Sequence, residues 1–140
     1  MLRPNQRKFR KNNKGRSLAK FEPKANTLKF GTHGIQALER GRITAKQIEA
    51  VRRSITNFLK RKGKVWIRIF PDFPITNKPS EVRMGKGKGN VAYWVCNIKP
   101  GRILYEIAGP EPKLLKNALE YASKKLPVAV KILARSIFNS

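Results

Sequence analysis

The chain has 140 residues and a formal net charge of +24 at pH 7, because 32 Lys and Arg residues outnumber 8 Asp and Glu residues. This length and a hydrophobic content of 40% suit one domain with a core and exclude wholesale disorder. The excess positive charge predicts a polyanionic partner such as nucleic acid. One Cys excludes a disulfide framework and a cysteine-rich zinc site, and no apolar run approaches the roughly 18 residues that a membrane span needs.

Residues 1–30 are expected to form a basic extension, followed by a single α/β domain over residues 31–140. The first sixteen residues contain no acid and seven cations, which are the candidate nucleic-acid contacts of this segment: Arg3, Arg7, Lys8, Arg10, Lys11, Lys14 and Arg16. The segment lacks the apolar region of a secretory signal and the Ser/Ala-rich pattern of a transit peptide. A targeting peptide is the alternative, but we favour a basic arm that becomes ordered on phosphate.

The strongest helix signal covers residues 44–62. Thr44 and Gln47 form a capping box at its start, and Gly63 is expected to end it. One apolar stripe about 100° wide is expected to pack on the core, and it contains Ile48, Val51, Ile55, Phe58 and Leu59. Three cations seven residues apart are expected to form a ridge on the opposite side: Lys46, Arg53 and Lys60.

Residues 64–70 alternate in a pattern typical of a strand. Three prolines interrupt the following passage up to about residue 81, which leaves room for a short edge strand. The next predicted strand, residues 91–98, is apolar on both faces and is therefore expected to lie in the centre of a sheet.

Pro100 and Gly101 indicate a type II turn, after which residues 102–107 are expected to return as an antiparallel partner of residues 91–98. A second helix is expected from residue 109 to about residue 126. Its inward positions are Leu115, Ala118, Leu119 and Ala122, and a last strand is expected to begin at Val128. This order predicts an α+β fold, a two-layer sandwich with two helices on one face of a mainly antiparallel sheet.

The loop at residues 83–90 has the clearest chemical character. Glycine occupies every second position from Gly85 to Gly89, which favours positive φ angles or a close approach of the backbone to a partner. The intervening lysines add charge, so we expect the loop to cradle phosphate of a nucleic acid. The candidate contacts are Arg83, Met84, Gly85, Lys86, Gly87 and Lys88. The pattern fits neither a Walker A loop nor a dinucleotide fingerprint, and a solvated flexible hairpin is the alternative.

No residue pattern indicates catalysis, a cofactor or a metal site. His33 has no metal ligand at suitable spacing, so a hydrogen-bonding or RNA-contacting imidazole is expected. Cys96 is expected to fill space within a strand. Trp66 and Trp94 could stack on RNA bases, although their apolar surroundings favour core packing.

Motifs along nearly the whole chain follow one known order. They are residues 1–4 with 8–11, 41–50 (GRITAKQIEA), 64–72 (KVWIRIFPD), 74–76, 78–79, 82–90 (VRMGKGKGN), 100–106 and 125–127. On these motifs the chain resembles the bacterial-type ribosomal protein L sixteen family of the large subunit. Residues 20–30 match only loosely, and residues 136–140 extend a little beyond the common end.

The resemblance implies an α/β sandwich that binds large-subunit ribosomal RNA late in assembly and has no catalytic activity of its own. It also implies a place close to transfer RNA near the A and P sites and the peptidyl transferase centre. Neighbouring large-subunit proteins are then further partners, and no homo-oligomer is expected. By position, the arm and the loop at 83–88 match segments that contact RNA near the transfer RNA sites, and the helix at 44–62 matches one that carries further ribosomal RNA contacts.

Two other functions are compatible with the residues. One is a free cationic nucleic-acid chaperone outside the ribosome, and the other is an RNA-modifying or RNA-cleaving enzyme that uses His33. Frequent Asn, Lys and Ile residues are typical of A+T-rich coding sequences. Because the N-terminus also lacks the pattern of a transit peptide, this residue usage favours an organelle-encoded protein of the mitochondrial matrix. The bacterial cytoplasm is the alternative location.

Overall fold

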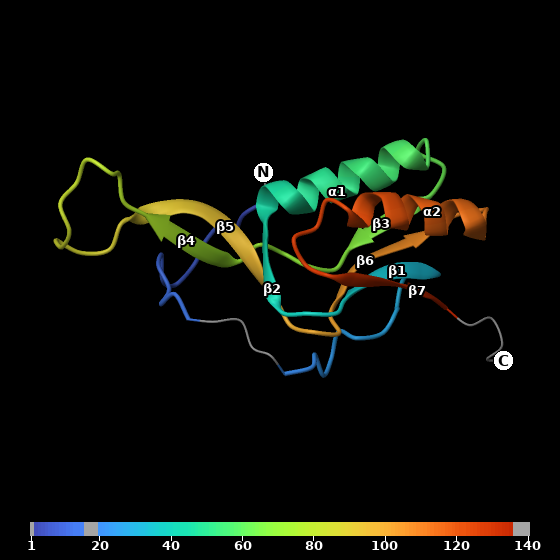
Figure 1. The fold of residues 1–140 in the computed structure, drawn as a ribbon, viewed down its shortest axis with the longest axis horizontal. Coiled ribbons are helices and arrows are strands. Elements are labelled where there is room, and N and C mark those ends of the chain that lie inside the picture. The colour runs from blue at the N-terminus through green and yellow to red at the C-terminus, as the bar shows by residue number, and fades with distance from the viewer. Residues whose placement is uncertain (1, 16–19, 136–140) are drawn as a thin grey trace.

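The computed structural model describes residues 2–15 and 20–135 (Figure 1). Its elements follow in the order β1 (His33–Ala37), β2 (Gly41–Thr44), α1 (Ala45–Phe58), β3 (Lys64–Ile67), β4 (Phe73–Asn77), β5 (Asn90–Ile98), β6 (Ile103–Ala108), α2 (Pro112–Ser123) and β7 (Val130–Ala134). A four-stranded sheet has the order β3-β6-β1-β7, and a three-stranded sheet has the order β2-β5-β4. All of these neighbours pair antiparallel. Both helices lie on one side of the four-stranded sheet, and the β4–β5 hairpin extends away from them (Figure 1).

The expected α+β class with both helices on one side is confirmed, but the strands form two sheets. The predicted pairing of residues 102–107 with residues 91–98 is wrong. Gly101 has a φ of 91°, as the turn requires. Directly beyond the turn, however, the Ala37 N–H donates to Arg102 O at 2.8 Å, and the Gly101 N–H donates to Ala37 O at 2.7 Å. The chain therefore changes sheets at this turn, and β6 pairs with β1 and β3.

Helix α1 begins as predicted. The Thr44 hydroxyl accepts from the Gln47 N–H at 3.2 Å, and the Gln47 side chain accepts from the Thr44 N–H at 2.9 Å. Its apolar stripe is also confirmed, because Ile48, Val51, Ile55 and Leu59 are buried and Phe58 packs against the core. The predicted end at Gly63 is wrong: the helix ends at Phe58, and Lys60 and Arg61 adopt left-handed φ angles of 51° and 62°.

Other boundaries differ by a few residues. Strand β3 ends at Ile67, three residues earlier than predicted, and β7 begins at Val130. Helix α2 is shorter at both ends, although its four predicted inward residues are buried. Strand β4 is the expected edge strand, and β5 is central in its sheet as expected. The first half of β5 is nevertheless largely exposed, because it lies in the projecting hairpin.

The core joins the four-stranded sheet to both helices. Tyr105, in the middle of β6, is completely buried, and its hydroxyl donates to Ile48 O in α1 at 2.8 Å. Burial raises the pKa of Tyr105, so the phenol stays protonated. Among the described residues, no helix is both long enough and apolar enough to span a membrane.

Candidate nucleic-acid interface

The N-terminal arm lies against the β4–β5 hairpin and its loop. Lys11 Nζ donates to Lys88 O at 2.9 Å, and Lys88 Nζ donates to Asn12 O. The two candidate RNA-binding segments, 77 residues apart in sequence at this contact, are therefore in direct contact. The described cations of the arm are exposed, namely Arg3, Arg7, Lys8, Arg10, Lys11 and Lys14. Arg16 lies outside the described residues.

Arg42 fixes the far end of the arm, a role that the sequence did not suggest. Its guanidinium donates to Lys14 O at 2.5 Å and to Gly15 O at 3.2 Å. On the body of the protein it donates to the Asn97 side chain at 3.0 Å and lies 5.0 Å from the centre of the Phe73 ring. Strand β2 was not predicted, so no signal placed this side chain beside the arm.

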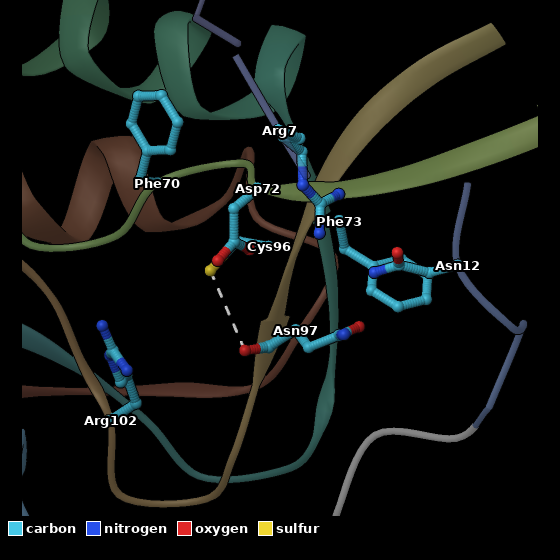
Figure 2. A pocket seen from close by; sticks show the side chains of 8 residues that line it. All are labelled: Arg7, Asn12, Phe70, Asp72, Phe73, Cys96, Asn97 and Arg102. Carbon is cyan, nitrogen blue, oxygen red and sulfur yellow. Dashed lines mark hydrogen bonds between the residues drawn. The ribbon is translucent and has the colours of Figure 1, made fainter. Parts of the chain in front are cut away.

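Arg7 connects the arm to the outer part of β5. Its guanidinium lies 5.6 Å from the centre of the half-buried Trp94 ring, in range of a cation–π interaction. Figure 2 shows Arg7 and Asn12 beside Phe73 and Asn97 in a shallow pocket. Trp94 is therefore only partly buried, and Arg7 already covers one face of its ring. Trp66 instead stacks near Phe30, with ring centres 6.2 Å apart.

The loop at 83–88 adopts the backbone that its glycines permit. Gly85, Lys86 and Gly87 have φ angles of 99°, 60° and 90°, so three successive residues are left-handed. A Cβ at Gly89 would lie only 2.5 Å from Asn77 O, which makes this glycine a close-approach position. The expected positive φ angles are thus found at Gly85 and Gly87, whereas Gly89 approaches the neighbouring strand of the protein itself. Close approach of the loop to a nucleic acid remains a prediction. Arg83, Met84, Lys86 and Lys88 are exposed, with Met84 completely so.

The predicted ridge on α1 is reduced to two exposed cations, Lys46 and Arg53. Lys60 lies beyond the end of the helix, because the chain has already turned into the left-handed region. Arg53 also donates to Glu49 at 3.3 Å. Hydrogen bonds from Arg52 and Arg53 hold the pKa of Glu49 at about 2, so this carboxylate is charged and offsets part of the positive face.

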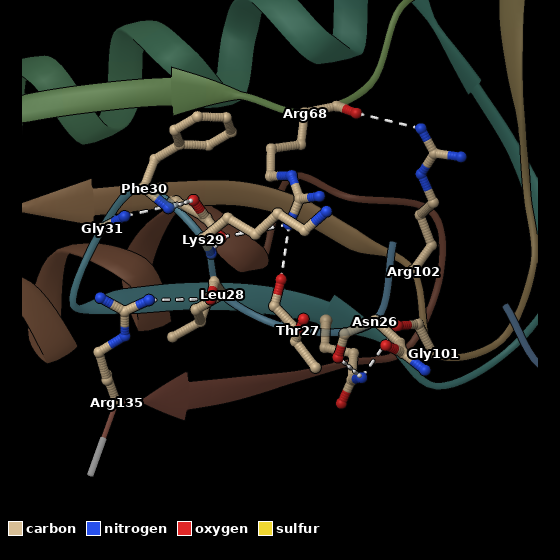
Figure 3. A network of polar contacts seen from close by, with 12 residues as sticks. Asn26, Thr27, Leu28, Lys29, Phe30, Gly31, Arg68, Gly101, Arg102 and Arg135 are labelled. Atoms are coloured by element: carbon tan, nitrogen blue, oxygen red, sulfur yellow. Dashed lines mark hydrogen bonds and ion pairs between the residues drawn. The ribbon is translucent and has the colours of Figure 1, made fainter. Parts of the chain in front are cut away.

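A buried carboxylate anchors the segment between the arm and β1. Glu106 is completely buried in β6 and accepts from the backbone N–H groups of Lys29 and Phe30, each at 2.7 Å. Arg68 donates to the same carboxylate at 3.3 Å and to Thr27 O at 2.6 Å (Figure 3). The single acid in the predicted strand at residues 102–107 was the available signal for this anchor. The predicted boundary after residue 30 remains a prediction.

The remaining candidates for chemistry have ordinary environments. Cys96 is buried, and burial raises the pKa of its thiol, which disfavours a reactive thiolate. His33 begins β1, where its ring shares a hydrogen bond of 3.0 Å with the Thr32 hydroxyl and partial burial lowers its pKa. Within residues 2–15 and 20–135, no group of three or more His, Cys, Asp or Glu residues could hold a metal ion.

Comparison with known proteins gives the family. The family described as ribosomal protein L16p/L10e matches residues 4–133. Large ribosomal subunit protein uL16 of Psychrobacter arcticus is 56% identical over 98% of this chain and 99% of its own length. The uL16 proteins of Pseudoalteromonas atlantica and Maricaulis maris are 51% and 54% identical and are covered over 99% and 98% of their lengths.

These relatives are bacterial, which favours the bacterial alternative over the mitochondrial location that residue usage suggested. The enzymatic hypothesis based on His33 is not supported, because the family consists of structural ribosomal proteins. The resemblance found in the sequence is confirmed over almost the full chain. The chain therefore belongs to the ribosomal protein L16p/L10e family and is a structural ribosomal protein, not an enzyme.

Proposed function

We propose that this protein is built into the large ribosomal subunit of a bacterial cell, where it binds large-subunit ribosomal RNA mainly through phosphate contacts. Family membership supports the ribosomal location, and the charge of +24 supports binding to a polyanion. Neighbouring proteins of the same subunit are the further partners. The family resemblance along nearly the whole chain also implies incorporation late in assembly.

One observation carries the RNA-binding part of the proposal: hydrogen bonds from Lys11 to Lys88 O and from Lys88 to Asn12 O join the arm to the loop. Both segments are rich in exposed cations and poor in acids. Without phosphate nearby, holding these charges together is unfavourable, because like charges repel. A nucleic-acid backbone that contacts both segments would neutralise them, and it would release counterions.

Within this function, we assign transfer RNA contact to the loop at 83–88 and ribosomal RNA contact to the arm and to Lys46 and Arg53 of α1. The loop lies at the tip of the projecting hairpin, away from the helices (Figure 1), and can therefore reach a neighbouring molecule. Its positions match the family segment that lies near the A and P sites and the peptidyl transferase centre. The helix cations lie on the solvent side of α1 and suit the surrounding ribosomal RNA.

Charge reversal in the loop tests this assignment. The double variant Lys86→Glu and Lys88→Glu should fold and enter large subunits but should bind transfer RNA at the A site more weakly, because the loop buries little apolar area. The matched control is Lys113→Glu with Lys116→Glu, two exposed residues of α2 with the same change of net charge. Equal transfer RNA binding by both double variants would contradict the assignment of the loop.

The alternative is a free cationic nucleic-acid chaperone, which the total charge alone would also permit. Sucrose-gradient sedimentation of cell extract distinguishes the two functions. Stable co-migration with large subunits at moderate salt is expected for the ribosomal protein. A chain that sediments only with heterogeneous RNA, or remains at the top of the gradient, would support the chaperone and contradict the proposal.

A further inference from the structure

Three hollows lie next to one another between the arm, the start of α1 and the outer half of β5. The first and second share Leu2 and Lys46 in their linings. The second and third share Arg3 and Trp94. Because neighbouring hollows share these side chains, they adjoin one another, and together they are here called the arm groove.

The charge of the arm groove is strongly positive. Six cations and a single acid line it within the described residues, namely Arg3, Arg7, Arg10, Lys11, Lys46 and Arg53, with Glu49. The one carboxylate is already engaged by neighbouring arginines of α1. The arm groove is therefore complementary to a chain of phosphates, and it joins the cations of the arm to those of α1.

An aromatic ring is exposed in the middle of the arm groove. Tyr93 is 49% exposed and lines the central hollow, which has a volume of about 830 Å³. One face of its neighbour Trp94 already carries the Arg7 guanidinium. In the described part of the chain, no ring or guanidinium stacks on Tyr93. A planar group can therefore reach this ring.

The central hollow lies where the three-stranded sheet loses a strand. Strand β2 pairs with β5 only as far as Thr44 opposite Val95, because the chain then enters α1. Along residues 91–94, β5 thus has no β2 partner on this side, and the arm residues Leu2 and Arg3 line the opening. The opening exposes a strand edge whose backbone groups can hydrogen-bond to base edges or ribose hydroxyls.

We propose that the arm groove binds an unpaired stretch of RNA, with one base stacked on Tyr93 and the adjoining phosphates held by Arg3 and Lys46. In a duplex the bases are stacked inside the helix and cannot reach the ring, whereas splayed bases of single strands commonly stack on aromatic side chains. This inference rests on the proposed ribosomal RNA binding and names the part of the chain that distinguishes unpaired from paired RNA.

The test compares two labelled RNA probes by fluorescence anisotropy with the full chain. One is an oligouridylate of about ten nucleotides, within the roughly 4–16 nucleotides bound by single-strand-binding domains, and the other is a blunt duplex of equal length. Tyr93→Leu should weaken oligouridylate binding at least about fivefold, the loss expected for one stacked base, and should leave duplex binding within about twofold. Tyr93→Phe should retain binding, because the ring remains.

Matched controls separate the arm groove from general surface effects. Tyr121→Leu removes a ring that is 51% exposed on α2, far from the arm groove in sequence and fold, and should bind oligouridylate like the parent chain. Lys46→Ala should weaken oligouridylate binding more than Lys116→Ala, an exposed lysine of α2. Circular dichroism verifies that each variant is folded.

The outcomes distinguish this inference from the proposed function. If Tyr93→Leu binds oligouridylate as tightly as the parent, or loses duplex binding equally, the arm groove is not a site for unpaired RNA. Such a result leaves the ribosomal role intact if the parent chain still co-sediments with large subunits. Failure of the parent chain to co-sediment would instead contradict the proposed function.

Discussion

The change Glu106→Gln is the sharpest test of how the protein positions its N-terminal segment. The carboxylate is completely buried and accepts three backbone N–H bonds, two of 2.7 Å and one of 3.2 Å, and one contact from Arg68. The amide of Gln keeps one acceptor oxygen but directs its own N–H groups toward donors. At least one backbone N–H and the Arg68 guanidinium therefore lose their charged acceptor.

The expected cost follows from these contacts. A hydrogen bond to a charged group contributes about 1.5–3 kcal/mol, and removing one partner of a buried ion pair costs about 3–5 kcal/mol. Since Arg68 is only 11% exposed, the buried case applies. We therefore expect Glu106→Gln to lower the free energy of unfolding by about 3–5 kcal/mol, a large share of the roughly 5–15 kcal/mol of a typical domain.

Urea unfolding followed by tryptophan fluorescence measures this loss. Trp66 is a local reporter, because it stacks near Phe30, whose N–H donates to Glu106. Hydrogen exchange should also show faster exchange of the Lys29 and Phe30 amides. Glu120→Gln, an exposed position on α2, is the control and should change stability by less than about 0.5 kcal/mol. A loss below about 1 kcal/mol for Glu106→Gln would refute the anchoring role derived from the buried contacts.

Three further predictions concern α1. Ile55→Asp should abolish cooperative unfolding in circular dichroism, because it buries an unpaired charge. Ile55→Val should lower the free energy of unfolding by only about 0.5–1.5 kcal/mol. A folded Ile55→Asp variant would mean that this face is not buried. Thr44→Ala should lower the free energy of unfolding in urea by about 1 kcal/mol through loss of the capping box, and an unchanged midpoint would contradict that. The Arg52 hydrogen bond lowers the pKa of Glu49 from 4.5 to about 2, so its stabilisation is present above about pH 4.5 and is lost as the pH falls toward 2. The stability difference between the parent chain and Glu49→Gln should shrink over that range, and a constant difference would show that the ion pair is absent in solution.

Local signals explain what could be predicted from the sequence. The capping box at Thr44 and the apolar stripe of α1 depend on residues three or four positions apart, so their geometry follows from the helix alone. The turn at Gly101 and the glycines at 85 and 87 likewise reflect φ angles that other residues rarely adopt. The arm and the loop could be recognised for the same reason, because charge and glycine spacing are local properties.

Long-range contacts explain what could not be predicted. Strand β6 pairs with β1 through backbone hydrogen bonds to Ala37, which lies more than sixty positions before residue 102. Nothing in the sequence near residue 102 indicates this pairing. The end of α1 depends on Lys60 and Arg61 adopting left-handed angles that their residue types do not favour. The contact of Lys11 with Lys88 and the role of Arg42 likewise require the folded hairpin. No sequence pattern therefore indicates that the arm packs against the rest of the protein.

The central claim is that the arm and the loop of this ribosomal protein bind RNA together within the large subunit. An electron cryomicroscopy map of large subunits isolated from the source cells tests it most directly. The account predicts density for this chain with the arm and residues 83–88 in contact with RNA phosphates and with Lys11 still beside Lys88. Subunits that lack the chain, or that hold it with the arm and loop facing solvent, would contradict the claim.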